Sequence, residues 1–425
     1  MIKAIALIDS NNFYTACEEL IDPTLIGKPL IILSNNDGCI IARNPEARQH
    51  NIPMGEAYHR IRHKIETLNI EVRSSDYALY GDMSQRLMSL LRQHSEELDI
   101  YSIDEAFISI TRPPEYNLSQ WARQLRAFIY QNLGLPIAIG IGTNKVQAKL
   151  ANHIAKTIDN HAGIFDLCTA EDLNMTLESI QIEKVWGIGR KLSRWCRMLG
   201  IENAKQLRDM PTGPLRKKCG VVGVRLQKEL RGETSLNHFL IQPPKKETCV
   251  SKSFHRAITT KEELRQAISN HVICASEKLR EQRQRAGSIR VFTRTSQYIS
   301  DFYSQTATQK LAIPSNNTSV LLKIALDLTN HIYRPHTPLM KAGVIMQDLQ
   351  GIDSLQLQLI ESISISNLQR QEKLMTAIDK LNKRYGRNTV TWPASKMKSG
   401  WNMRREQLGH SSITRIDKIP IAKAY

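Results

Sequence analysis

Two adjacent carboxylates, Asp104 and Glu105, interrupt an apolar stretch at residues 100–110 that has the pattern of a β-strand. Burying a carboxylate costs several kcal/mol unless a positive charge neutralises it. No Lys or Arg lies between residues 93 and 111, so the sequence around this pair offers no cation. A divalent metal ion is the partner that we expect, and a solvated Asp-Glu turn is the alternative.

A third carboxylate stands at the end of another strand-like segment. Residues 2–8 are apolar apart from Lys3, and Asp9 follows them directly. Three carboxylates on two strands can then converge on one site. Because neighbouring residues of a regular strand point to opposite faces, Asp104 and Glu105 can share this site only if the backbone turns there.

The charge of the chain is unevenly distributed. A length of 425 residues suggests about three domains. The formal net charge is +17, but residues 1–110 carry 10 Lys and Arg against 16 Asp and Glu, and the remainder carries +23. This basic part predicts a polyanionic partner, since each phosphate contact releases condensed counterions. A basic protein without such a partner is the alternative.

The composition also excludes several classes of protein. No apolar run reaches the roughly 18 residues of a membrane span, and the N-terminus lacks the charged start and cleavage site of a signal peptide. We therefore expect a cytoplasmic protein with no membrane partner. The seven cysteines are scattered without a Cys-x-x-C pair, which predicts free thiols.

Strand-like and helix-like segments alternate in residues 1–166, which predicts an α/β or α+β sheet domain. Within it, the segment from Pro23 to Asp76 reads as an inserted subdomain without an obvious core of its own. Helices are expected at residues 77–91 and 118–132, and a buried strand at 136–142.

The downstream half has a different pattern. Residues 167 to about 240 look mostly helical, and Pro243-Pro244 marks a linker. A capping box at Thr260 begins a helix that should run to about residue 285. The remaining expected elements are strands at 288–295 and 342–346, a helix from 319, and a helix at 368–381. Together they predict a small α/β unit followed by a basic tail.

The sequence contains two glycine-rich segments that could hold a phosphate group. Gly140-Ile141-Gly142 follows a strand, but it has neither the Walker A spacing nor the third glycine of a dinucleotide fingerprint. The helix after it carries Lys145, Lys149 and Lys156, which we expect on a solvated face. By contrast, residues 185–201 have the layout of a helix-hairpin-helix, whose backbone N–H groups can hold a DNA phosphate.

Residues 33–44, 101–107 and 185–190, in this order, resemble the Y-family of translesion DNA polymerases. The similarity covers essentially the whole chain and is greatest to the UmuC-type catalytic subunits of bacterial DNA polymerase V. It implies a multidomain α+β fold arranged as a polymerase right hand. The implied domains are the palm (1–22 and 75–166, a mixed sheet plus helices), small fingers (23–74), a helical thumb with the helix-hairpin-helix (167–240), a linker (241–246), an α/β little finger (247–350) and a basic C-terminal extension (351–425).

The resemblance also implies roles for individual residues. Asp9, Asp104 and Glu105 would be the catalytic carboxylates that hold two Mg²⁺ ions, with the Ser10 carbonyl as a backbone ligand. Tyr14 would be the steric gate against a ribose 2′-hydroxyl. The other implied contacts are Phe13 under the nucleotide, Arg48 and Lys156 on the triphosphate, and Gly187, Gly189, Arg190, Arg290 and Arg294 on DNA.

Several partners follow from the same resemblance. They are primer-template DNA, deoxynucleoside triphosphates, a dimer of a processed UmuD-like protein and a RecA-like activator. Residues 356–360 stand where such proteins carry a sliding-clamp peptide, with Gln356, Leu357, Leu359 and Ile360 as the expected contacts. Ile360 replaces the usual terminal aromatic residue.

The function that we predict is error-prone, template-directed DNA synthesis past damaged bases in the SOS response, in the bacterial cytoplasm and on the nucleoid. A non-catalytic DNA-binding scaffold is the alternative, and a nucleotidyl cyclase is a second enzymatic one. The complete set of Asp9, Asp104, Glu105 and Tyr14 argues against a scaffold. The basic downstream regions argue against a cyclase, which has no duplex to hold.

Overall fold

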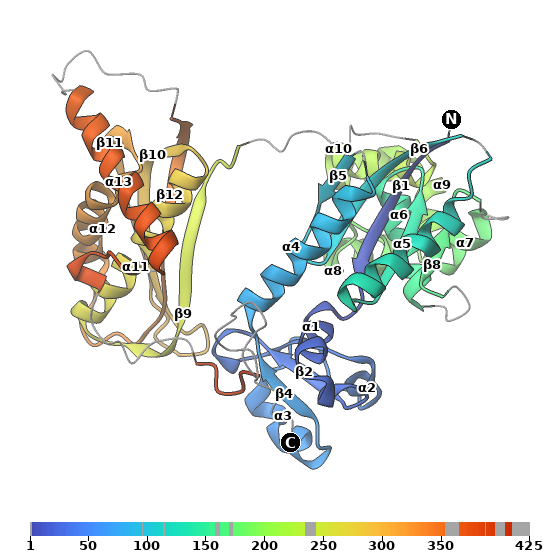
Figure 1. Cartoon of the computed structure of the whole chain (residues 1–425), viewed down its shortest axis with the longest axis horizontal. Helices are drawn as coiled ribbons and strands as arrows, with labels where there is room; N and C mark the ends of the chain where they lie inside the picture. Colours follow the sequence, from blue (N-terminus) through green and yellow to red (C-terminus); the bar gives the residue numbers. More distant parts are fainter. Residues whose placement is uncertain are drawn as a thin grey trace, which may run out of the picture. The chain divides into compact units, whose positions relative to one another are not determined.

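The computed structural model describes residues 2–95, 97–113, 115–157, 162–169, 173–233, 244–352, 365–386, 388–395 and 404–409. The chain divides into two compact units, residues 1–241 with 405–425 and residues 242–404 (Figure 1). Among the helices of these described ranges, none is long and apolar enough to cross a membrane.

A five-stranded sheet forms the centre of the first unit (Figure 1). Its order is β5 (Glu97–Ile100), β6 (Glu105–Arg112), β1 (Ile2–Ser10), β7 (Ile137–Gly142) and β8 (Ile164–Asp166). The central strand β1 is antiparallel to both β6 and β7, and β8 is parallel to β7. The strands expected at residues 2–8 and 136–142 are therefore confirmed, and they lie side by side.

Helices cover both faces of this sheet. They are α1 (Phe13–Ile21), α4 (Tyr77–Gln93), α5 (Leu118–Leu133) and α6 (Lys145–Thr157). Ala4, Ala6 and Ile8 of β1 join the core formed with α1, α4 and α5, whereas Ile5 and Leu7 pack with α6 on the other face. This alternation follows from the two-residue period of a strand. Both predicted helices, α4 and α5, are confirmed to within two residues at each end.

Two glycines of β7 allow α6 to approach the sheet closely. A Cβ on Gly140 would lie 2.0 Å from the Asn152 backbone nitrogen and 2.4 Å from the Ala148 carbonyl oxygen. A Cβ on Gly142 would lie 2.6 Å from the Gln147 Cβ. The glycines thus serve helix–sheet packing, in agreement with the prediction that this segment is not a phosphate loop.

This close packing leads to a first prediction. Gly140→Ala should lower the free energy of unfolding by about 3 kcal/mol or more, because backbone atoms of α6 must move to admit the methyl group. Gly81 in α4 is the matched control, since a Cβ there meets no atom within 4 Å. Gly81→Ala should raise stability by about 0.5–1 kcal/mol. Urea denaturation of the full chain measures both changes; equal stability of the two variants would contradict the packing argument.

A smaller three-stranded sheet lies between α1 and α4 in the chain. Its order is β3 (Ile40–Arg43), β2 (Leu30–Leu33) and β4 (Glu71–Ser74), with helices α2 (Pro45–Gln49) and α3 (Tyr58–Thr67). Ile31, Leu33, Ile40 and Ile65 are almost fully buried together. The expectation that this segment has no core of its own is therefore wrong, because its apolar residues gather from strands and helices separated in the sequence.

The expected helical segment completes the first unit. It contains α7 (Leu173–Ser179), α8 (Arg190–Met198), α9 (Ala204–Asp209) and α10 (Thr212–Leu230), which confirms the prediction for the residues described. Leu177, Ile182 and Leu207 share a core with Leu150 and Ile154 of α6. Helix α6 is therefore buried between the sheet and this helical segment.

The second unit is a four-stranded antiparallel sheet with two long helices. The sheet order is β11 (Ser304–Ser315), β10 (Gln284–Thr295), β12 (Leu339–Gly351) and β9 (Thr248–Ile258); the helices are α11 (Lys261–Glu281) and α12 (Thr318–Ile332). All neighbouring strands are antiparallel, so the unit is α+β rather than α/β. Thr260 caps α11 as predicted, but the helix ends at Glu281 because Arg283 adopts a left-handed conformation before β10.

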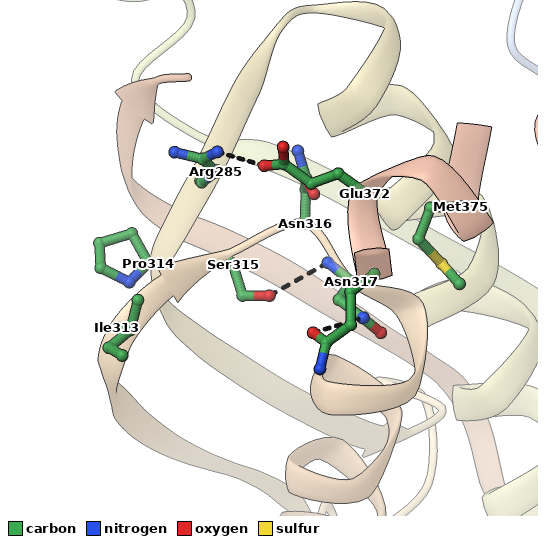
Figure 2. Close-up of a pocket in the computed structure, with 9 residues that line it drawn as sticks. Arg285, Ile313, Pro314, Ser315, Asn316, Asn317, Glu372 and Met375 are labelled. Carbon is green, nitrogen blue, oxygen red and sulfur yellow. Dashed lines mark hydrogen bonds and ion pairs between the residues drawn. The ribbon is translucent and has the colours of Figure 1, made fainter. Parts of the chain in front are cut away.

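Helix α13 (Ile365–Tyr385) contacts the rest of this unit through ion pairs and hydrogen bonds. Arg280 donates to both carboxylate oxygens of Asp379 at 2.6 and 2.8 Å, and Arg285 pairs with Glu372. Figure 2 shows the small pocket beside the Arg285–Glu372 pair, where Ser315 accepts from the Asn317 backbone. Its volume of about 30 Å³ has room for little more than water. The pocket therefore marks a packed junction and is too small for a ligand site.

Candidate active site

Strands β1 and β6 bring the predicted carboxylates to one end of the five-stranded sheet. Asp9 and Glu105 are paired directly across the two antiparallel strands. Residues opposite each other in such a pair lie on the same face of the sheet. Asp104 precedes β6, and its carbonyl accepts from the Ser10 N–H at 3.0 Å. The convergence that the sequence predicts is thus present in the backbone.

The turn required between the adjacent carboxylates is built by Ser102. Its hydroxyl donates to the Asp104 carboxylate at 2.6 Å and accepts from the N–H of Glu105 at 3.1 Å. The Glu105 carbonyl in turn accepts from the N–H groups of Tyr101 and Ser102 at 3.1 Å. These bonds bend the chain just before the strand starts. The alternation of side chains between the two faces of β6 therefore does not set the direction of the Asp104 side chain.

Three lysines of α6 neutralise carboxylates of this sheet. Lys149 lies 2.8 Å from Glu105, Lys156 pairs with Asp9, and Lys145 pairs with Asp99 of β5. The expectation of a solvated lysine face is therefore wrong, because the glycines of β7 draw α6 onto the sheet. The cations that the local sequence lacks arrive from a distant helix. The absence of a local Lys or Arg is thus not by itself an argument for a metal.

Burial and the Lys156 ammonium have opposite effects on the pKa of Asp9. The pKa of Asp9 is raised to about 7, chiefly by burial; Lys156 opposes this rise, and the negative charges of Glu105 and Asp104 add to it. Near neutral pH the Asp9 carboxyl group is thus close to the point at which it takes up a proton. Any additional cation at this end of the sheet would favour the charged form.

A cavity of about 350 Å³ lies between the end of the large sheet and the small sheet. The large sheet and the start of α1 provide its acidic and aromatic wall, and the small sheet and α2 provide its basic wall. Its lining residues are Asp9, Ser10, Asn12, Phe13, Tyr14, Ile41, Ala42, Arg43, Arg48, Met54, Ile103, Asp104 and Lys156. Carboxylates therefore face guanidinium groups across a space large enough for a nucleotide-sized ligand.

Tyr14 is held in this cavity by other aromatic side chains. Its ring stacks on Tyr80 of α4, with centroids 4.5 Å apart and planes at 20°, and meets Tyr77 edge to face at 6.1 Å. Tyr80 is itself fixed, since its hydroxyl donates to the buried Glu18 at 2.7 Å. Asn12, the N-cap residue of α1, adopts a left-handed conformation. Tyr14 therefore has little freedom to turn away.

Arg43 is a functional candidate that the sequence analysis did not assign. It ends β3 and lines the cavity beside Arg48, which bonds to Asn12 at 3.3 Å. Burial lowers the pKa of the Arg43 guanidinium, and the charge of Arg48 lowers it as well. Two neighbouring guanidinium groups form a site for an anion such as a phosphate chain. The sequence signal was weak, because an Arg after a short strand is usually solvated.

The donor atoms at this site suit a hard divalent cation. Asp9, Asp104 and the residue Ser10 line one cavity, and carboxylate and carbonyl oxygens are the ligands that Mg²⁺ prefers. Lys156 already places a positive charge on Asp9. Glu105 instead pairs with Lys149, and in the described residues no three His, Cys, Asp or Glu side chains form a metal-binding cluster. The residues thus fit a metal at Asp9 and Asp104, while the Glu105 contribution stays a prediction.

The helix-hairpin-helix segment adjoins the carboxylates through Trp186. Gly187 has a φ of 94°, and Gly189 caps α8, whose first residue Arg190 is exposed. The Trp186 ring packs on Tyr101 at 5.6 Å, and the Lys149 ammonium lies 5.3 Å from it. Trp186 is therefore a packing residue. The contact of the hairpin N–H groups with DNA stays a prediction.

The remaining predicted residues are not among those that line this cavity. Arg290 and Arg294 belong to β10 of the second unit, where Arg290 donates to Thr308 at 3.1 Å and Arg294 is exposed. The clamp-peptide residues at positions 356–360 lie outside the described residues. Their roles stay predictions.

Three family matches cover most of the chain. Residues 8–153 match the impB/mucB/samB family, residues 245–359 match the C-terminal domain of the same family, and residues 372–422 match a domain of unknown function. The chain is 36% identical to the protein UmuC of Salmonella typhimurium over 97% of its own length and 99% of that protein. It is 25% identical to DNA polymerase IV of Bacillus velezensis over 91% of this chain and 92% of that protein.

Solved structures agree on the fold. A Y-family DNA polymerase chimera of Dbh and Dpo4 aligns with 82% of this chain and 99% of its own, at a TM-score of 0.65 and 20% identity. The structure of DinB from Sulfolobus solfataricus aligns at a TM-score of 0.51. The fold is thus the multidomain α+β fold of the Y-family polymerases. By its sequence, the chain belongs within that class to the impB/mucB/samB family, the UmuC-type branch.

Proposed function

We propose that this chain is a DNA-directed DNA polymerase that performs error-prone translesion synthesis in the SOS response. The observation that carries the proposal is a cavity lined by the carboxylates Asp9 and Asp104, by the guanidinium groups of Arg43 and Arg48, and by the Tyr14 ring. Phosphoryl transfer from a triphosphate needs this opposition of a metal-binding edge and a cationic wall. The similarity to UmuC and to DNA polymerase IV supports the same class of reaction.

Each residue of the cavity has a role in this reaction. Asp9, Asp104, Glu105 and the Ser10 carbonyl would hold two Mg²⁺ ions, which when bound activate the primer 3′-hydroxyl and neutralise charge on the phosphates. Arg43, Arg48 and Lys156 would hold the triphosphate, Phe13 would pack under the nucleotide, and Tyr14 would exclude the 2′-hydroxyl. Lys156 is suited to this because its ammonium already lies at Asp9.

We assign the parts of the fold to the domains of a Y-family polymerase. The five-stranded sheet with α1, α4, α5 and α6 would be the palm, and the small sheet with α2 and α3 the fingers. Helices α7 to α10 would be the thumb, and the second unit up to β12 the little finger. A small fingers part that encloses little of the nascent base pair would account for tolerance of damaged templates.

Primer extension tests the function directly. In the presence of Mg²⁺ and of UmuD-like and RecA-like proteins from the same organism, the wild-type protein should insert a nucleotide opposite an abasic template site. We infer these partners, and a bacterial cytoplasmic location on the nucleoid, from the likeness to UmuC. DNA binding without any incorporation under these conditions would favour the scaffold alternative.

DNA binding should depend strongly on salt. If six or more phosphates are neutralised, raising the salt concentration from about 50 to 200 mM should weaken binding by roughly 10³-fold or more. Arg190→Ala should lower the salt slope by about one contact, since Arg190 begins the exposed hairpin helix. Arg208, whose charge is matched by Asp209 at 2.7 and 2.9 Å, is the control, and Arg208→Ala should leave the slope unchanged. A flat salt response would contradict phosphate binding.

Clamp binding rests on residues 356–360 alone. Gln356→Ala combined with Leu359→Ala should lower the amount of sliding clamp that the protein retains in a pull-down. The pair Ser362→Ala and Ser364→Ala, just beyond the peptide, is the control. Unchanged retention by the first variant would remove the clamp from the set of partners.

A further inference from the structure

A short segment near the C-terminus returns to the first unit and forms main-chain hydrogen bonds there. We call residues Glu406–Gly409 the docking segment. The Ser74 N–H donates to the Gln407 carbonyl at 2.8 Å, and the Gln407 N–H donates to the Ser74 hydroxyl at 3.0 Å. The Glu406 N–H donates to Asp37 at 2.9 Å. All three bonds use backbone atoms of the segment. The first unit therefore binds the main chain of the segment and not its side chains.

The surface that receives the docking segment is the free edge of a sheet. Strand β4 is an outer strand of the small sheet, and Ser74 is its last residue. An unpaired strand edge presents backbone groups that another extended segment can bind. Asp37 completes the acceptor set, because its second carboxylate oxygen accepts from the Ser74 hydroxyl at 2.6 Å. Asp37 belongs to the segment 33–44, whose Ser-Asn-Asn-Asp-Gly motif otherwise has no role in the site.

The docking segment lies where the small sheet joins the large one. The chain enters the small sheet after Asp22 and leaves it after Ser74. Across this junction Arg73 donates to Asp22 at 3.1 Å, and both side chains are mostly buried. A Cβ on Gly409 would lie 3.1 Å from the Glu18 carboxylate of α1 and 3.4 Å from the Arg73 guanidinium. The segment therefore touches both sides of the junction, α1 and β4.

From this arrangement we infer that the docking segment is a positioning element for nucleotide binding. By joining β4 to α1 it fixes the small sheet, which carries Arg43 and Arg48, relative to the sheet that carries Asp9 and Asp104. This inference rests on the proposed function, since it assigns the two arginines to the triphosphate. The inference also assigns a role to residues 406–409, which lie within the domain of unknown function that matches residues 372–422.

The backbone bonding suggests a sharp pair of variants. Gln407→Pro removes the N–H that donates to Ser74, whereas Gln407→Ala keeps every main-chain bond. The proline variant should raise the KM for the incoming deoxynucleotide roughly tenfold while kcat and DNA affinity stay within about twofold, because misplaced binding groups weaken substrate capture. The alanine variant should match wild type. If the proline variant folds poorly, a chain shortened to end at Arg404 replaces it. This shortened chain should show the same rise in KM.

Hydrogen exchange at the Ser74 amide separates the possible outcomes. Protection should be lost in Gln407→Pro and kept in Gln407→Ala, since this N–H bonds to the Gln407 carbonyl. Protection that persists in the proline variant and in the shortened chain would overturn the docking. Lost protection with an unchanged nucleotide KM would overturn the positioning role. Wild-type protein that docks the segment but never extends a primer would instead refute the proposed function.

Discussion

Replacing Asp104 with alanine is expected to lower the rate of nucleotide incorporation by roughly 10³-fold or more, which corresponds to about 4 kcal/mol in the barrier. Asp104 lines the cavity and, unlike Asp9, Asp99 and Glu105, has no lysine partner among the described residues. Its charge is therefore available for a metal ion. Single-nucleotide primer extension with Mg²⁺ measures the loss, and DNA affinity should stay near that of wild type.

Asp99→Asn is the matched control for this experiment. Asp99 is a carboxylate of the neighbouring strand β5 that pairs with Lys145, and it does not line the cavity. Its loss should change incorporation by only a few fold. Full residual activity of Asp104→Ala, or an equal loss in Asp99→Asn, would contradict the assignment of the metal carboxylates.

Removal of the Tyr14 ring is expected to admit ribonucleotides. In Tyr14→Ala the ratio of ribonucleotide to deoxynucleotide incorporation should rise by roughly 100-fold, the size of effect that steric exclusion of one small group can supply. The physical reason is the fixed ring, which stacks on Tyr80 and cannot swing aside at low cost. Competition of each nucleotide pair for one primer measures the ratio.

Tyr14→Phe separates the ring from its hydroxyl. This variant keeps the aromatic stack on Tyr80 and should retain the discrimination of wild type, because the ring supplies the clash. Loss of discrimination in Tyr14→Phe would assign the effect to the hydroxyl instead. No change of sugar discrimination in Tyr14→Ala would remove Tyr14 from the gate.

The parts of the fold with strong local signals were predictable from the sequence. Apolar runs give β1 and β7, the acidic cap Asp76 starts α4 by accepting from the Ala78 and Leu79 N–H groups, and Thr260 starts α11. The carboxylate end of the sheet was predictable for the same reason, since Asp9 lies near the end of the apolar strand β1 and the Asp104-Glu105 pair lies at the start of the apolar strand β6. These features depend on neighbouring residues only.

Features that depend on distant segments were not predictable. The edge strands β9 and β11 were missed because many of their side chains, such as His255 and Gln309, are exposed and polar. The lysines of α6 look solvated in the sequence because their carboxylate partners lie on other strands. Arg43 becomes a cavity residue only when the small sheet lies opposite the carboxylates.

The contact between α6 and β7 constrains how the chain can change over evolutionary time. The atoms that a side chain at Gly140 would strike are the Asn152 nitrogen and the Ala148 carbonyl, which every amino acid carries. No replacement of Asn152 or Ala148 can therefore make room, unlike a clash between two side chains. The same helix holds Lys149 and Lys156 against Glu105 and Asp9, so displacing it would disturb structure and charge together. A lineage that lost this glycine could recover by reversion but not by compensation within the helix.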